Sequence, residues 1–266
     1  MISCGAPAFR RDEAKTRWYH TPMSQKARFR AIASLILITA LSPTLPAREP
    51  AEELIAGVHI FGPAERMEVE ATMSISEGAA GQDRRLRGWY EREEDAFSIF
   101  VEVIHPPFLR NMKFLLSRDG GREESWMRTS RGVRRLGTSD GGERVFGSHF
   151  TARDFSRIDP GESEINYVEP PEGGEAVIDV KDEGRSRRRF YIDVESRLIR
   201  RIEFFDAAGR RIKEYELLEV EQESGRPVPK RAVMRELDGS GETEITLTEV
   251  GFPSSIPRRY FSRGNL

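Results

Sequence analysis

The feature that most constrains the fold is a regular turn rhythm in the C-terminal half of the chain. Gly209, Gly225 and Gly241 follow one another at intervals of 16 residues, each within a polar turn sequence. Runs of alternating apolar and polar residues fill the intervals: RLIRRIEFF, RIKEYELLEV, PKRAVMREL and ETEITLTEV. This spacing leaves room for a long strand between successive turns, so it predicts a hairpin meander and therefore an antiparallel sheet.

Further strands are expected from Met67 onward. MEVEATMSI, RLRGWYE, AFSIFVEVI and NMKFLLSR are rich in β-branched and aromatic residues and are separated by Gly, Asp or Pro. In the third run Ile99 and Val101 fall on one face of a strand, while Phe100 makes the other face apolar as well. The sequence has neither a βαβ alternation nor a longer repeat, which disfavours a parallel doubly wound fold and a solenoid.

Only a few helices are expected. Residues 50–61, PAEELIAGVHIF, predict a short helix, because Pro50 suits a first helical turn and Leu54, Ile55 and Val58 recur at helical spacing. These three side chains form one apolar stripe. The predicted helix therefore docks on the sheet along that stripe.

Two long segments interrupt the strand pattern. Residues 137–158 and 159–175 are rich in Gly, Ser, Pro and acids, and long connections in a compact domain are usually functional or flexible. In the first segment, Thr151 and Asp154 have the spacing of a helix cap. This predicts a short helix that begins there and places Phe155 on its buried side.

The N-terminus carries a targeting pattern. Basic Lys26, Arg28 and Arg30 precede the apolar run AIASLILITAL, and Ala47 provides the small residue that a signal peptidase requires before its cut. The apolar run is too short to cross a bilayer, which takes about 20 residues. We therefore expect a secretory signal cut after Ala47, export to the periplasm, and no transmembrane segment in the mature chain.

The chain is thereby divided into three parts. Residues 1–22 have no role in a signal and are expected to be a non-native upstream extension, residues 23–47 form the signal peptide, and residues 48–266 form a single domain. That domain has 35 Lys and Arg against 42 Asp and Glu, a formal net charge of −7, which argues against a nucleic-acid partner. The one cysteine, Cys4, precedes the cut and excludes an intramolecular disulfide and a thiolate metal site.

Residues that could carry catalysis form no convincing constellation. His59, His105 and His149 show no metal-ligand spacing, so neither a metal nor another cofactor is predicted. Ser148 stands beside His149, but a nucleophile elbow needs glycines two positions on either side of the serine, and Gly147 is only one position before it. A serine esterase is therefore a remote alternative, and we predict no enzymatic activity.

The segment WMRTSRGVRRLG, followed by RVFGSHFTARDF, resembles the signature of the LolA-like outer-membrane lipoprotein-sorting protein family. That signature combines a Trp-containing strand, an Arg-Arg pair and a Phe-Gly-Ser-Asp-Phe-Thr-x-x-Asp loop. His149 departs from it, since the family usually has an acid there. HPPFLRNMKFLL, FFDAAGRRIKEYEL and IPRRYFSRGNL resemble further parts of the family in the same order, from about Ala51 to Leu266. The residues at matching positions are Trp126, Arg134, Arg135, Phe146, Gly147, Ser148, Phe150, Thr151 and Asp154.

The resemblance implies a mainly β protein with a few helices. The sheet would be an incomplete antiparallel barrel, or a strongly curved sheet, with helices over its open side and an apolar interior for acyl chains. The function implied is a periplasmic carrier of a lipid or an acylated lipoprotein toward the outer membrane. Its partners would be inner-membrane export machinery and an outer-membrane acceptor. The alternative is a non-transporting envelope protein on the same scaffold, which senses lipid or bridges partner proteins.

Aromatic residues are the candidates for contact with an acyl chain. We expect Phe146, Phe150 and Phe155 to plug or line the cavity, together with Phe100 and Trp126. Burying one CH₂ contributes about 0.8 kcal/mol, so a sixteen-carbon chain supplies roughly 12 kcal/mol when fully enclosed. A carrier that also releases its cargo therefore needs a competing internal conformation that refills the cavity.

The remaining matched residues are expected to shape the loop. Gly147 would permit its bend, and Asp154 would cap the short helix or pair with Arg134 or Arg135. Ser148 and Thr151 complete the motif. These expectations concern contacts that a structure can test directly.

Overall fold

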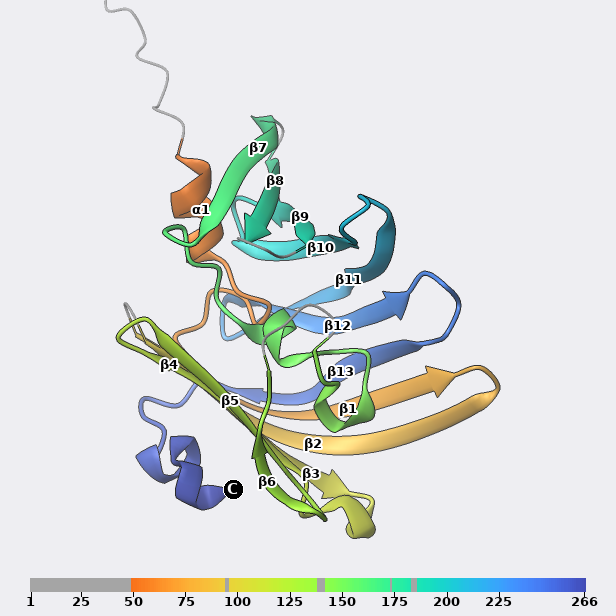
Figure 1. Ribbon diagram of the computed structural model, residues 1–266. Coiled ribbons are helices and arrows are strands. Elements are labelled where there is room, and N and C mark those ends of the chain that lie inside the picture. Colours follow the sequence, from red (N-terminus) through yellow and green to blue (C-terminus); the bar gives the residue numbers. More distant parts are fainter. Residues whose placement is uncertain (1–48, 94–95, 138–141, 173, 183–185) are drawn as a thin grey trace, which may run out of the picture. The chain divides into compact units, whose positions relative to one another are not determined.

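The computed structural model describes residues 49–93, 96–137, 142–172, 174–182 and 186–266 (Figure 1). The expected extension over residues 1–22 and the expected signal peptide over residues 23–47 lie outside the described residues. Residues 48–266 form a compact unit of their own. The following description concerns that unit.

Antiparallel strands make up most of the described chain. The strands are β1 (Arg66–Glu77), β2 (Ala80–Arg92), β3 (Phe97–His105), β4 (Lys113–Asp119), β5 (Arg122–Thr129), β6 (Gly132–Arg135), β7 (Ser163–Glu172), β8 (Glu175–Asp182), β9 (Arg187–Asp193), β10 (Leu198–Phe205), β11 (Arg211–Glu223), β12 (Arg226–Glu236) and β13 (Glu242–Gly251). One α-helix, α1 (Ala51–Gly57), precedes them. Short 3₁₀ helices are η1 (Pro107–Leu109), η2 (Val145–Gly147), η3 (Ala152–Phe155), η4 (Arg258–Phe261) and η5 (Arg263–Asn265).

All the strands belong to one sheet, in the order β6-β5-β4-β3-β2-β1-β13-β12-β11-β10-β9-β8-β7. The sheet is thus two meanders, β1 to β6 and β7 to β13, which are joined where β1 pairs with β13. It curves without closing into a barrel, and the connection from β6 to β7 passes in front of it (Figure 1). This confirms the antiparallel sheet predicted from the turn rhythm and the strong curvature that the family resemblance implies.

The second of the two predicted interruptions is in part a strand. Residues 163–172 form β7, an edge strand that pairs with β8 on one side. Pro170 and Pro171 argue against a strand in the sequence, because proline has no backbone N–H to donate to a neighbouring strand. An edge strand tolerates proline, since one row of its backbone N–H groups needs no partner strand.

The N-terminal helix is shorter than its apolar pattern. It ends at Gly57, and Val58 is already extended, with φ −101° and ψ 152°. Leu54, Ile55 and Val58 are nevertheless all buried in the main core, as their spacing predicts. Helix α1 contacts β7 and so helps to cover the open side of the sheet.

The two faces of the sheet are covered by different segments. The larger core lies on the face that also holds α1, η2 and η3, and it includes Ile99 and Phe114. A smaller cluster on the other face packs Trp89, Phe100 and Leu115 against the C-terminal segment. There Tyr260 stacks on Trp89, with 4.0 Å between ring centroids. Alternate residues of β3 therefore serve two separate cores.

Candidate functional site: an apolar cavity behind the 144–158 loop

An apolar cavity lies between the first meander and the loop that connects β6 to β7. The sheet contributes Tyr90, Ile99 and Phe114 to its wall, and the loop contributes Phe146 and Phe155. The remaining lining residues are also apolar, apart from Trp89, whose ring packs in the cluster on the other face of the sheet. The free space is about 70 Å³, enough for only a handful of water-sized groups. In this conformation the loop's Val145, Phe146 and Phe155 close the cavity on the side opposite the sheet.

The loop turns sharply at Phe146 and Gly147. Both residues have positive φ angles, 54° for Phe146 and 74° for Gly147, and this left-handed conformation is costly for residues with a Cβ. The turn directs Phe146 into the core, where it is almost fully buried. The positive φ of Gly147 agrees with the expectation that this glycine permits the bend.

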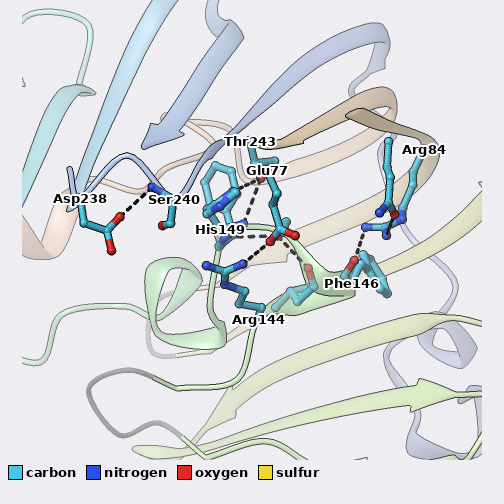
Figure 2. A network of polar contacts seen from close by, with 12 residues as sticks. Glu77, Arg84, Arg144, Phe146, His149, Asp238, Ser240 and Thr243 are labelled. Carbon is cyan, nitrogen blue, oxygen red and sulfur yellow. Dashed lines mark hydrogen bonds and ion pairs between the residues drawn. The ribbon is translucent and has the colours of Figure 1, made fainter. Parts of the chain in front are cut away.

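Polar contacts around its rim hold the loop against the sheet (Figure 2). Arg84 of β2 donates a hydrogen bond to the carbonyl of Phe146. Arg144 pairs with Glu77 at the end of β1, at 2.6 Å. On the other side, the backbone N–H of His149 donates to Oγ1 of Thr243 in β13, at 3.0 Å. The loop is therefore fastened to both meanders, close to where they join.

Arg84 is an unusual anchor because its guanidinium is largely buried. Its side chain also donates to Gln82, at 3.1 Å, while its Nε has no hydrogen-bond partner among the described residues. Burial lowers its pKa from the ordinary arginine value, and the charge of Glu77 acts in the opposite direction. Burying a charge costs free energy unless it is hydrogen-bonded, and here two neutral oxygens, the Phe146 carbonyl and the Gln82 amide oxygen, accept from the guanidinium.

The second part of the loop is the capped helix that its sequence predicts. Thr151 and Asp154 form a capping box around η3, with the Thr151 N–H donating to the Asp154 carboxylate at 2.7 Å. Phe155 is buried beneath it, as expected. Of the two roles expected for Asp154, the cap is the one observed, and the alternative ion pair with Arg134 or Arg135 is not formed. Asp154 instead pairs with Lys213 of β11, at 2.7 Å.

The two arginines of the matched pair lie away from the loop's core. Arg134 pairs with Glu143 and Arg135 lies 3.9 Å from Glu124. Both belong to β6, whose residues are all exposed. An edge strand places these side chains in solvent, so a partner deep behind the loop is out of their reach.

Ser148 and His149 bond to different groups, which offers no support for the esterase alternative. The Ser148 hydroxyl donates to the Val145 carbonyl at 2.7 Å and accepts from the Phe150 N–H at 3.2 Å. Nδ1 of His149 lies 2.8 Å from the Thr243 hydroxyl. Burial, and then the charge of Arg144, lower the pKa of His149. Both side chains are buried, and their hydrogen bonds stabilise the conformation of the loop.

His59 ties the loop to the segment that follows α1. The Phe61 N–H donates to its Nδ1 at 3.3 Å, so the proton lies on Nε2, which donates to the Phe155 carbonyl at 3.0 Å. Its ring stacks on Tyr90, with 5.0 Å between centroids. Complete burial lowers the pKa of His59 to about 4. The neutral imidazole thus links η3 to the cavity wall.

The aromatic residues expected at the cavity fall into two groups. Phe146 and Phe155 line it, and Phe150 packs behind Phe155 with 5.5 Å between ring centroids. Phe100 and Trp126 differ from the expectation, because both lie in the cluster on the other face, beneath the C-terminal segment. Their contacts there leave them remote from a ligand in this cavity.

The sequence reasoning missed several wall residues. Phe61, Tyr90 and Phe114 line the cavity from three separate segments. Alternation along β2 and β4 marks Tyr90 and Phe114 as core residues, but it does not indicate which core. Only the curvature of the sheet brings these side chains together.

Among the described residues, no helix is long and apolar enough to cross a membrane. The described part of the chain also has no cluster of His, Cys, Asp or Glu suited to a metal ion.

Comparison with solved structures places this architecture in the LolA-like fold. A domain described as an outer membrane lipoprotein-sorting protein from Vibrio parahaemolyticus has a TM-score of 0.67 and 17% identity, covering 81% of this chain and 95% of the other. A DUF1329 family protein from Desulfovibrio piger ATCC 29098 has a TM-score of 0.67 and 16% identity, covering 76% and 92%. A LolA superfamily protein from Nitrosomonas europaea has a TM-score of 0.61 and 16% identity, covering 81% and 97%. At these identities the likeness is one of fold.

The chain thus shares the fold of these solved structures, a curved antiparallel sheet. Residues 97–266 match the sequence model of a protein family whose description reads "Uncharacterized protein", and the chain belongs to that family. No curated protein sequence matches the chain.

Proposed function

We propose that this protein is a periplasmic carrier that binds the acyl chains of a lipid or an acylated lipoprotein and passes them toward the outer membrane. The observation that carries the proposal is the apolar cavity, whose wall is formed by the curved sheet and, on the loop side, by Phe146 and Phe155. A wall of this composition offers an acyl chain burial and offers a polar ligand almost nothing. The LolA-like fold of the structural relatives agrees with this proposal.

Loading requires the loop to move. The free volume of about 70 Å³ is far too small for an acyl chain. Displacement of Phe146 would open the space that this side chain occupies, at the cost of exposing it to water. An incoming chain would cover the same wall and recover that free energy, so the two occupants compete for one surface.

Competition of this kind explains how a carrier can release its cargo. Full burial of a sixteen-carbon chain contributes roughly 12 kcal/mol. If all of this free energy appeared as binding affinity, the chain would be released too slowly for a carrier. Refilling of the cavity by the loop offsets part of that gain. The rim contacts of Arg84 and Arg144 add to the stability of the closed form and lower the affinity further.

The experiment that tests this is displacement of a fluorescent fatty acid from purified protein, with and without Phe146→Ala. The smaller side chain leaves the cavity partly unfilled, so we expect about tenfold tighter binding, because a closed form that buries less apolar surface competes less well. Val168→Ala, at an exposed position on β7, is the matched control and should bind as the unaltered protein does.

Two outcomes would count against the carrier. If neither the unaltered protein nor Phe146→Ala takes up the fatty acid, the cavity is an ordinary core. The non-transporting module would then account for the scaffold. If Phe146→Ala binds more weakly, Phe146 is part of the binding wall and the loop is no competitor.

A further inference from the structure

The most exposed large apolar side chain of the described protein stands at one end of the sheet. Phe108 is 83% exposed and belongs to η1, in the connection between β3 and β4. Its neighbours Pro106 and Pro107 stiffen that connection. A phenylalanine this exposed contributes little to packing within the protein, so its ring is available to contact another molecule.

The tip is built to hold Phe108 outward. Leu109 and Met112 pack against the main core, and backbone hydrogen bonds close the turn, with Met112 N–H donating to the Leu109 carbonyl at 2.8 Å. Nε of Arg110 donates to the Ile104 carbonyl at 3.1 Å. A rigid tip loses little conformational freedom when it is buried elsewhere, which favours association.

The surroundings of the tip are basic, although the predicted domain as a whole is acidic. Residues 105–113 and 128–135 contain six Lys and Arg and no Asp or Glu. The pairing of Lys113 with Arg128 puts the β3–β4 connection and the β5–β6 turn at the same end of the sheet (Figure 1). The acids closest in register are Glu102, which pairs with Lys113, and Asp83, two residues from Arg85 on β2.

Some of these cations are engaged and some are available. Lys113 and Arg128 donate to carbonyls of the C-terminal segment, and Arg134 and Arg135 lie near acids. Arg110 and Arg131 are exposed and have no ion pair with a described residue. Phe108 thus projects from a surface that carries unneutralised positive charge on two adjoining turns.

We propose that this tip docks the protein on an anionic phospholipid bilayer. Phe108 enters the boundary between headgroups and acyl chains, while Arg110 and Arg131 meet the lipid phosphates. Aromatic side chains favour this depth, and basic residues close to an anionic surface add attraction that is lost at high salt. The site is separate from the apolar cavity and does not depend on the proposed carrier function.

The test is co-sedimentation of the purified protein with phosphatidylglycerol-containing vesicles and with pure phosphatidylcholine vesicles, at low and high salt. We expect binding to the anionic vesicles at low salt only. Phe108→Ser should lower the partition coefficient about tenfold, because the apolar area that enters the bilayer is lost. Arg131→Glu should lower it by a similar factor, since it reverses a charge at the surface.

Ile212→Ser is the matched control, since Ile212 is an exposed apolar residue on β11, and it should bind as the unaltered protein does. Phe108→Trp supplies a direct reading of depth, because its fluorescence should shift to the blue on addition of anionic vesicles. Failure of the unaltered protein to sediment with anionic vesicles at low salt would overturn the proposal, and so would equal binding by Phe108→Ser. In that case a protein partner would be the alternative occupant of the tip.

Discussion

At the scale of single residues, His59 makes the loop sensitive to acid. Burial lowers its pKa to about 4, against about 6.5 in the unfolded chain. Between these two values the unfolded state binds a proton that the folded state does not. The free energy of unfolding that this residue contributes is therefore complete above about pH 6.5 and is lost as the pH falls toward 4.

We expect this effect to reach roughly 3 kcal/mol at acid pH. His59→Gln should remove that part of the pH dependence, as measured by urea unfolding between pH 7 and 4. His105→Gln, at an exposed position, should keep the full dependence. Equal slopes for His59→Gln and the unaltered protein would show that His59 is not the titrating group.

The Tyr90 hydroxyl, unlike the His59 imidazole, makes no hydrogen bond within the described part of the chain that stabilises the folded state. It is buried and has no hydrogen-bond partner among the described residues, and burial raises its pKa to about 12. A buried polar group without a partner costs about 1–3 kcal/mol. Tyr90→Phe should therefore raise the free energy of unfolding by about 1 kcal/mol. A loss of stability in urea titrations would mean that the hydroxyl is satisfied, for example by an ordered water.

At the scale of elements, the capped helix η3 depends on one buried ion pair. The side chains of Asp154 and Lys213 are 4% and 10% exposed. Asp154→Ala removes the cap and also leaves Lys213 buried without its partner, which should cost about 3–5 kcal/mol. Hydrogen exchange at residues 151–156 should accelerate. Glu143→Ala, which breaks the exposed pair with Arg134, should change stability by less than about 1 kcal/mol. Similar losses for both variants would contradict the assignment.

The elements also show what the sequence could predict. The alternation in RLIRRIEFF and its successors, with glycines at the turns, is local information, and the meander it predicts is present. The cap formed by Thr151 and Asp154 is equally local. Partners such as Lys213 and Thr243 are not, since they lie 59 and 94 residues away from Asp154 and His149.

The same limit applies to Phe100. The sequence shows that both faces of β3 are apolar, and it predicts a cavity contact for Phe100. The curvature of the thirteen-stranded sheet decides which face of β3 meets the loop and which meets the C-terminal segment. No local sequence pattern specifies that curvature. The prediction for Phe100 is wrong because the loop packs on one face of β3 and the C-terminal segment packs on the other, and Phe100 lies on the second face.

At the scale of the whole unit, the two meanders and the loop meet at Gly241. Its φ is +153°, and an added Cβ would lie 2.1 Å from the Ser76 carbonyl and 2.9 Å from Nε2 of His149. Gly241→Ala should therefore cost more than about 2 kcal/mol by forcing the junction apart. Gly81→Ala, where nothing lies within 4 Å, should be close to neutral. Comparable melting temperatures for the two variants would contradict this account of the junction.

The proposal that the curved sheet holds acyl chains in place of its own loop can be decided by native mass spectrometry. The protein would be exported to the periplasm of a double-membraned host and purified without detergent. We expect an added mass that extraction identifies as a phospholipid or an acylated species, and we expect Phe146→Ala to carry it in a larger fraction of molecules. A mass of the bare chain, with no uptake of fluorescent lipid afterward, would contradict the claim.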